Sequence, residues 1–205
     1  MYNAKFIPIG RLRHRYLDND LINCMFAWLH PGPKLPAPIH QAFSADKLLA
    51  AYRLEGDDDA WLVAAKSGLV RVASDGTKTP LCAWDEVERA AWDGQERKFT
   101  INPINASPTQ CVLAKPTDKG ERERLDQLAR TLRQQVERAI VVRRDNVPLG
   151  GGALATITIR RRSDDSLYCL SLIEADASLN EEQLAALKQA ETQTKLSVGL
   201  ATQED

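Results

Sequence analysis

The segment WLVAAKSGLVRVASDGTKTPLCAWDEVERAAW, residues 61–92, decides the fold class of this 205-residue chain. Its apolar runs are short, and turn residues separate them at 66–68, 74–76 and 85–86. Gly76 makes the turn at 74–76 a strong signal because glycine adopts positive φ without steric cost. The segment therefore predicts a meander of short antiparallel strands.

The same pattern continues on both sides of this segment. A helical turn capped by Ser44 is expected to run into a first strand that ends near Leu54, and two further strands are predicted at 98–102 and 110–113. The dipeptide Asp93-Gly94 separates the strand at 87–92 from the next one. Seven short strands at this spacing indicate a sandwich or barrel, and they argue against a parallel sheet.

One strongly amphipathic helix is predicted at 121–139. Asp118 and Glu121 have the spacing of a capping box, and i,i+4 pairs of opposite charge line the outer face. A single apolar stripe at helical spacing predicts a helix that covers the strands. The stripe consists of Leu125, Leu128, Ala129, Leu132, Val136 and Ala139. We expect Trp61, Trp84, Leu125, Leu128 and Leu132 to share one core.

A smaller unit is predicted to follow at 141–205. Residues 139–144 have a β-like composition, a loop is expected at 147–152, and a hairpin is expected from strands at 153–161 and 167–174. A helix at 181–198 follows a cap at Asn180 or Ser178. A lone hairpin with one helix is marginally stable, so we expect this unit to pack on the barrel.

Residues 1–42 are predicted to be an N-terminal segment and a Pro-rich linker, partly disordered. The apolar stretch at 21–29 imitates a targeting sequence, but it is far shorter than the roughly 20 residues that span a bilayer. Pro31, Pro33, Pro36 and Pro38 predict extended chain at 30–42. Whether residues 1–24 precede a natural start at Met25 stays open.

The composition is that of an ordinary globular protein, with 43% apolar residues, 27% charged residues and a net charge of −1. Such a balance gives no global reason to expect a nucleic-acid or membrane partner. Cys24, Cys82, Cys111 and Cys169 stand far apart without Cys-x-x-Cys spacing. Reduced thiols, and hence a cytoplasmic location, are the preferred interpretation over a disulfide framework.

The strand pattern resembles the bacterial pleckstrin-homology-like domains. The resemblance rests on the runs at 61–65, 68–72, 80–92 and 97–101 and on the helix, and its most specific part is Trp84-Asp-Glu-Val-Glu-Arg. In particular, the chain is similar to actinobacterial proteins that append a Val-Pro-Leu-Gly-Gly segment, a hairpin and a helix. The resemblance covers about residues 45–200. It implies an α+β, mainly antiparallel fold: a seven-stranded, partly open barrel at 43–140, capped by the helix.

The loop at 55–59 departs from the lipid-binding members of that superfamily. Those relatives carry basic residues there, whereas this chain has Glu-Gly-Asp-Asp-Asp, which would repel a phosphorylated headgroup. The carboxylates lack the spacing of an EF-hand. We therefore interpret the loop as a solvated acidic turn and expect no metal site.

The sequence contains no recognisable catalytic constellation. His14, His30 and His40 all precede the predicted strands, so no catalytic residue, cofactor or metal ligand is assigned. The glycines at 150–152 are followed by a predicted strand and by no lysine, unlike a phosphate-binding loop.

Arginines near the predicted hairpin form the candidate partner surface. They are Arg143, Arg144, Arg160, Arg161 and Arg162. Such a cluster suits phosphates or an acidic partner, while pairing with Asp164, Asp165 and the acidic C-terminal helix is the favoured alternative. Few aromatic residues lie nearby, which argues against single-stranded nucleic acid.

Three functional hypotheses follow. The preferred one is a non-catalytic protein-interaction or scaffold module with an unknown protein partner. The second is peripheral attachment to an anionic membrane through the arginines and residues 11–29, and the third is a cryptic hydrolase. Arginines held by internal acids would favour the first hypothesis, and arginines exposed beside Phe26 and Trp28 would favour the second.

Overall fold

The computed structural model describes residues 36–43, 46–56, 59–173 and 178–200. The chain divides into two units, Met1–Lys34 and Leu35–Asp205, and every described residue belongs to the second. The apolar stretch at 21–29, Phe26 and Trp28 therefore lie outside the described residues, as do Asp57 and Asp58 of the acidic loop.

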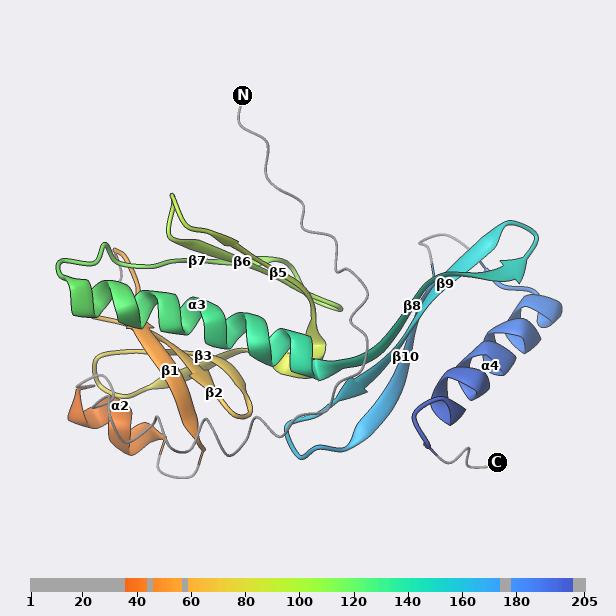
Figure 1. Cartoon of the computed structure of the whole chain (residues 1–205), viewed down its shortest axis with the longest axis horizontal. Helices are drawn as coiled ribbons and strands as arrows, with labels where there is room; N and C mark the ends of the chain where they lie inside the picture. Colours follow the sequence, from red (N-terminus) through yellow and green to blue (C-terminus); the bar gives the residue numbers. More distant parts are fainter. Residues whose placement is uncertain (1–35, 44–45, 57–58, 174–177, 201–205) are drawn as a thin grey trace. The chain divides into compact units, whose positions relative to one another are not determined.

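Seven antiparallel strands form two sheets in the first part of this unit (Figure 1). The four-stranded sheet has the order β1 (Leu48–Arg53), β2 (Trp61–Ala65), β3 (Gly68–Val72) and β4 (Lys78–Ala83). The three-stranded sheet has the order β5 (Val87–Asp93), β6 (Lys98–Pro103) and β7 (Thr109–Val112). The predicted meander is thus present, strand by strand.

The seven strands form a less closed structure than the predicted barrel. The α+β class and the mainly antiparallel pairing are confirmed, but the seven strands form no single closed sheet. A 3₁₀ turn, η1 (Trp84–Glu86), separates β4 from β5. An isolated bridge joins Leu54 to Leu113 beyond the ends of β1 and β7.

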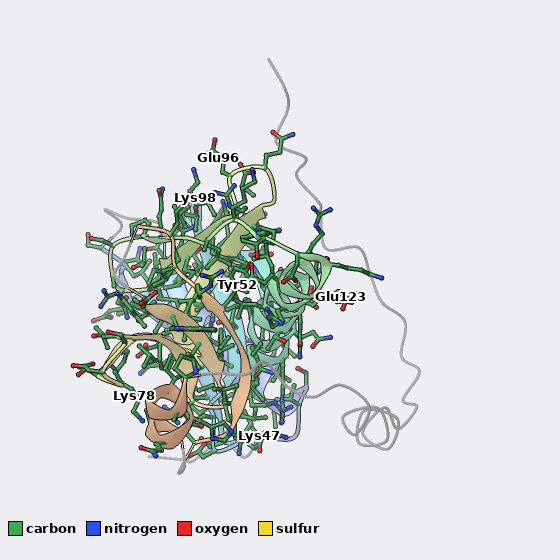
Figure 2. The ribbon with its side chains drawn as sticks, turned by 90° about the vertical axis from the view of Figure 1, so that its left-hand side faces the viewer. Lys47, Tyr52, Lys78, Glu96, Lys98 and Glu123 are labelled. Carbon is green, nitrogen blue, oxygen red and sulfur yellow. The ribbon has the colours of Figure 1, made fainter. Side chains whose placement is uncertain are left out.

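The helix α3 (Lys119–Ala139) supplies the core between the two sheets (Figure 1). Leu125, Leu128 and Leu132 are buried against Trp84 and residues of both sheets, which confirms the predicted stripe. Tyr52 of β1 belongs to this core, and Figure 2 shows Lys47, Lys78, Glu96 and Glu123 at the periphery.

The prediction that Trp61 shares this core is wrong. Side chains alternate across a strand, and Trp61 points to the outer face of the four-stranded sheet, where it packs beside Val63 and Val72. The sheet therefore has two apolar faces rather than one. The alternation within β2 contains this information, but its Val and Ala residues are apolar on both faces.

The outer face of the four-stranded sheet is covered by α2 (Ala37–Ala42). Ile39 is fully buried there and Phe43 nearly so. This corrects the prediction of extended linker over these residues. Proline is compatible with the first turn of a helix because the amide hydrogens of that turn have no acceptor within the helix, and here Pro36 is the N-cap.

The predicted capping box of α3 is half formed. Asp118 accepts a hydrogen bond from the Glu121 amide at 2.8 Å, as predicted. The Glu121 carboxylate does not return to Asp118; it accepts from the amide and hydroxyl of Thr117 and from Arg53 of β1. Of the predicted i,i+4 pairs, Arg133 and Glu137 form an ion pair at 2.8 Å.

The second part of the unit is a three-stranded sheet with one helix, and this corrects the predicted hairpin. Its order is β10 (Leu167–Ile173), β9 (Ala153–Arg161) and β8 (Ile140–Gly150), and α4 (Glu181–Leu196) packs on β8 and β9 (Figure 1). The predicted loop at 147–152 belongs largely to β8, which pairs with β9 through register shifts. Leu149, Ala155, Ile157 and Leu187 form its small core.

Candidate functional site

The five predicted arginines do not share one surface. Arg160 is fully buried, so it is removed from the candidate partner surface. Arg143 and Arg144 lie on β8, opposite Thr158 and Ile157 of β9. Arg161 and Arg162 lie at the end of β9 and in the turn that follows it.

Arg160 joins the C-terminal sheet to the turn between the two N-terminal sheets. Its Nη1 donates to the carbonyl oxygens of Asp85 at 3.2 Å and Val87 at 2.9 Å. Tyr168, its cross-strand partner on β10, donates its hydroxyl to the same Asp85 carbonyl at 3.1 Å. Burial lowers the pKa of Arg160 and raises that of Tyr168, yet a guanidinium remains charged at neutral pH.

Arg143 and Arg144 differ in their partners. The Nε of Arg143 donates to the Asp145 carboxylate at 2.8 Å, which neutralises this arginine locally. Arg144 is exposed. One local ion pair and one solvated side chain give this part of β8 little capacity to bind an anion.

Arg161 and Arg162 instead contribute to a basic cleft whose other residues come from distant parts of the sequence. Arg138 belongs to the last turn of α3 and Lys66 to the turn between β2 and β3. We use the name basic cleft for Lys66, Arg138, Arg161 and Arg162 together with Trp84 and Asp165, which also line it.

Asp165 pairs with two of the four cations that line the basic cleft. The Asp165 oxygen Oδ1 lies 3.1 Å from Nη2 of Arg138 and 3.8 Å from Nη1 of Arg161. Nε of Arg161 is buried and has no hydrogen-bond partner in the described part of the chain. A buried donor without a partner costs free energy.

Local chemistry fixes the turn that carries Arg162 and Asp165. Asp164 accepts hydrogen bonds from the amide and hydroxyl of Ser166, and these bonds lower its pKa. Asp165 has a φ of 67°, in the left-handed region that aspartate tolerates. The Arg162 guanidinium lies over the Tyr168 ring, 4.3 Å from its centroid, which restrains this side chain.

The sides of the basic cleft that Trp84 and Arg138 form are held in place at the ends of β2 and α3. The indole of Trp84 donates to the carbonyl of Ala65 at 2.8 Å, which holds η1 against the end of β2, next to Lys66. Arg138 lies at the C-terminal end of α3, where the helix dipole favours a cation. The basic cleft is therefore preorganised by backbone contacts on each side.

The volume of the basic cleft limits what enters it. Its cavity holds about 30 Å³, whereas a single water needs about 10–15 Å³ by a comparable measure. A carboxylate or one oxygen-rich headgroup matches this space, while a nucleobase or a drug-sized ligand requires several hundred Å³.

Sequence reasoning identified Arg161 and Arg162 and missed Lys66 and Arg138. Arg138 carries a weak signal, because cations are common in the last turn of a helix. Lys66 carries none, since it resembles any other lysine in a turn. Only the packing of α3 against the ends of β2 and β9 brings these side chains together.

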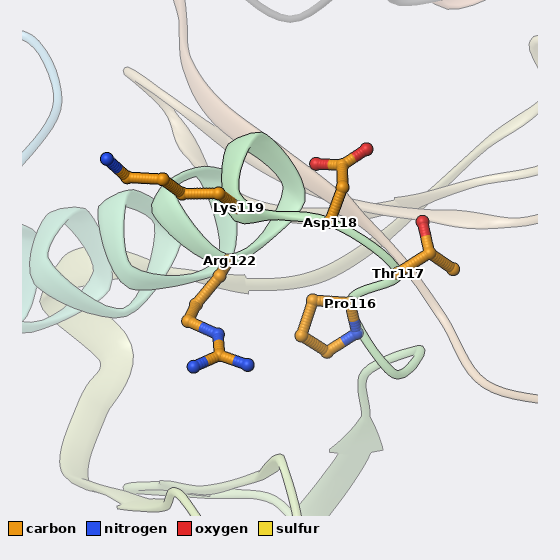
Figure 3. Close-up of a pocket in the computed structure, with 5 residues that line it drawn as sticks. All are labelled: Pro116, Thr117, Asp118, Lys119 and Arg122. Carbon is orange, nitrogen blue, oxygen red and sulfur yellow. The ribbon is translucent and has the colours of Figure 1, made fainter.

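A larger hollow of about 390 Å³ lies at the start of α3. Figure 3 shows that its cations, Lys119 and Arg122, extend in different directions. Asp118 is engaged in capping the helix. The hollow therefore lacks converging groups, and we do not consider it a functional site.

The described residues contain no cluster of three or more His, Cys, Asp or Glu side chains that could hold a metal ion. In the acidic loop, Glu55 pairs with Arg97 at 2.8 Å. Cys82, Cys111 and Cys169 are free thiols, and burial raises the pKa of Cys82 to about 11, which makes it a poor nucleophile.

Comparisons with known proteins give little further information. No protein-family model matches the chain, and no curated protein matches it either. Among solved structures, it matches the FERM and C-terminal domain complex of Drosophila Merlin with a TM-score of 0.31 and 16% identity. The match covers 47% of this chain and 32% of that one, so the aligned part spans about a third of the Merlin chain.

Within the ranges that the structure describes, no helix combines the length and the apolar character needed to cross a membrane.

Proposed function

We propose that this chain is a non-catalytic interaction module on a pleckstrin-homology-like scaffold, and that its basic cleft binds an acidic segment of a protein partner. One observation carries the proposal: four cations from separate parts of the chain line a cleft that holds a single carboxylate, and the buried Nε of Arg161 lacks a hydrogen-bond partner among the described residues. A carboxylate from a partner would balance this charge and accept this hydrogen bond.

The order of elements supports the scaffold. The sequence runs through four antiparallel strands, then three antiparallel strands, then the long helix α3. The leucines of α3 pack between the two sheets. This is the arrangement that a pleckstrin-homology-like domain requires. Fold alone assigns no activity, so the function proposed here rests on the basic cleft.

The pattern of contacts favours a protein partner over a membrane surface. A flat anionic surface attracts free cations, at about 1 kcal/mol each. Arg143 is paired with Asp145, Arg161 lies beside Asp165, and Arg160 is buried. The remaining cations, Lys66, Arg138 and Arg162, are exposed around a cavity small enough for one carboxylate side chain of a partner to fill.

No observation favours the hydrolase hypothesis. Ser163 is the hydroxyl that lines the basic cleft, and no histidine lines the cleft with it. His40, the histidine of the described residues, lies exposed on α2. We therefore propose neither a catalytic residue nor a cofactor.

Fluorescence anisotropy with a labelled oligoglutamate peptide tests the proposal. We expect saturable binding by the wild-type chain, weakened at least tenfold in the double variant Arg138→Gln/Arg162→Gln, because two cations of the basic cleft are lost. The matched control is Arg130→Gln/Arg144→Gln, which removes the same net charge from exposed positions outside the cleft. The control should bind the peptide as the wild type does.

The competing hypotheses have distinct outcomes in the same series. Equal loss of binding in both double variants would show a nonspecific charge effect and contradict the proposal. Co-sedimentation with phosphatidylserine vesicles at near-physiological salt, without peptide binding, would establish the membrane alternative instead. Tighter binding of a single-stranded oligonucleotide than of the peptide would also contradict the proposal.

A further inference from the structure

The free edge of β10 differs from every other sheet edge in the described part of the chain. Natural proteins protect their edge strands with charges, prolines, register shifts or short length, because an unprotected edge pairs with other strands. Three sheets give six edges: β1 and β4, β5 and β7, and β8 and β10. Five of these edge strands carry such protection.

The protecting features can be named for each of the five. β1 ends in Arg53 and has a register shift, β4 contains Lys78, Pro80 and a shift, and β5 contains three charged residues and a shift. β7 has only four residues. β8 contains three charged residues, Pro148 and three register shifts.

β10 has none of these features. Its sequence, Leu-Tyr-Cys-Leu-Ser-Leu-Ile, contains no charge, proline or glycine, and all seven residues are half-buried. It pairs with β9 in unbroken register along its whole length. On the side away from β9, β10 has no strand partner among the described residues. An extended, uncharged strand with free backbone groups is the structure that accepts an added strand.

We propose that β10 pairs antiparallel with β10 of a second copy of this chain, which joins the two C-terminal sheets into one six-stranded sheet. A two-fold axis at Leu170 places this residue opposite itself, Tyr168 opposite Leu172, and Cys169 opposite Ser171. This register pairs all seven residues and brings no like charges together. The edge is therefore self-complementary, which favours a second copy over an unrelated strand.

An exposed leucine on α4 adds apolar surface at the same place. Glu191 accepts a hydrogen bond from Ser171 of β10, so its flank of the helix faces β10. Leu184 precedes Glu191 by seven residues and therefore shares this flank. It is 44% exposed, which is unusual for a leucine beside a sheet. In the dimer, Leu184 would lie against the edge strand of the second copy.

The size of the contact predicts a weak dimer. Stable interfaces bury about 1,200–2,000 Å², whereas this contact consists of one seven-residue strand and one leucine from each copy. We therefore expect dissociation at micromolar concentrations. Association does not depend on ligand binding at the basic cleft, so failure of either proposal leaves the other standing.

Sedimentation equilibrium of the full chain over about 1–300 µM, the range in which an interface of this size dissociates, tests the dimer. The mass should rise from 22.8 kDa toward twice that value. Leu170→Lys and Leu170→Glu should each remain monomeric, because like charges would face each other at the axis. An equimolar mixture of the two variants should regain the dimer, since opposite charges then meet.

Leu196→Lys is the matched control, because this leucine is 60% exposed at the end of α4 and lies outside the proposed contact. It should dimerise as the wild type does. Circular dichroism must show that each variant is folded. A wild-type monomer at all concentrations would overturn the proposal, as would dimers of Leu170→Lys. Protection from hydrogen exchange, in a monomer, of the β10 amides that point away from β9 would show that another segment of the same chain occupies the edge.

Discussion

Glu121 connects the start of α3 to the first sheet. One carboxylate oxygen accepts from the amide and hydroxyl of Thr117, at 2.8 and 2.9 Å, and the other from Arg53 of β1 at 2.7 Å. These hydrogen bonds, first that from the Thr117 amide, hold the pKa of Glu121 below its ordinary value near 4.5. The charged form is thus the one that the folded state prefers.

Replacing Glu121 by glutamine should lower the free energy of unfolding by about 2 kcal/mol at pH 7, the usual loss when a charged acceptor is removed. Since the folded-state pKa is lowered, the contribution is complete above about pH 4.5 and disappears as the pH falls through the folded-state value. Urea unfolding at several pH values should show wild type and variant converging at acidic pH.

Glu137→Gln is the control, because Glu137 forms an exposed i,i+4 pair with Arg133. It should change stability by no more than about 0.5 kcal/mol. A Glu121→Gln variant whose deficit stays constant from pH 7 to pH 3 would contradict this account of Glu121.

At the scale of elements, α2 shows that the effect of proline on helix formation depends on its position in the helix. Proline disfavours helix in the residue before it and in a helix interior, which predicted extended chain here. In the first turn it is harmless, and Pro36 caps a short helix whose Ile39 is fully buried against β2 and β3. α2 is thus a structural part of the four-stranded sheet.

Ile39→Ala should lower the free energy of unfolding by about 3 kcal/mol, as expected for truncation of a fully buried side chain. His40→Ala, at the neighbouring exposed position, should have little effect. Thermal unfolding of both variants checks this. Equal melting temperatures would mean that residues 37–42 contribute no more than a linker does.

The elements that sequence predicted well are those with local signals. β2 was predicted with its observed bounds because turn residues border its apolar run, and α3 because its stripe repeats over 19 residues from 121 to 139. The first half of β8 was indicated by its β-like composition at 139–144. Its second half was predicted as a loop because Pro148 and Gly150 indicate one, whereas β8 accommodates them through register shifts at an edge.

At the scale of the whole unit, the contacts that matter most connect residues far apart in sequence. Arg160 reaches the carbonyls of Asp85 and Val87, 75 and 73 residues away. An arginine in a strand of alternating polar and apolar residues is expected to be solvent-exposed. No local sequence pattern predicts that backbone carbonyls of a distant segment will accept its hydrogen bonds. For the same reason, only two of the four cations of the basic cleft were predictable.

Arg160→Met should separate the two parts of the unit. The Val87 carbonyl would lose the Arg160 donor and the Asp85 carbonyl would keep only the Tyr168 hydroxyl, at a cost of about 2 kcal/mol. In urea, with Trp28 replaced by phenylalanine in all variants, Trp61, Trp84 and Trp92 report on the N-terminal sheets by fluorescence, while circular dichroism reports on the whole chain. The two transitions should coincide in the wild type and diverge in the variant.

Arg144→Met controls for the loss of an arginine at an exposed position of the same sheet. Its transitions should coincide, as in the wild type. Coincident and unshifted transitions in Arg160→Met would show that Arg160 does not couple the C-terminal sheet to the rest of the unit.

Nuclear magnetic resonance of the isotope-labelled chain tests the binding of an acidic segment at the basic cleft most directly. On titration with an oligoglutamate peptide, we expect saturable shifts of the Trp84 indole, of the amides at 161–166, and of Lys66 and Arg138. The amides at 117–122, around the larger hollow, should not move. Shifts confined to 117–122, or shifts spread evenly over all exposed basic residues, would contradict the basic cleft as the binding site.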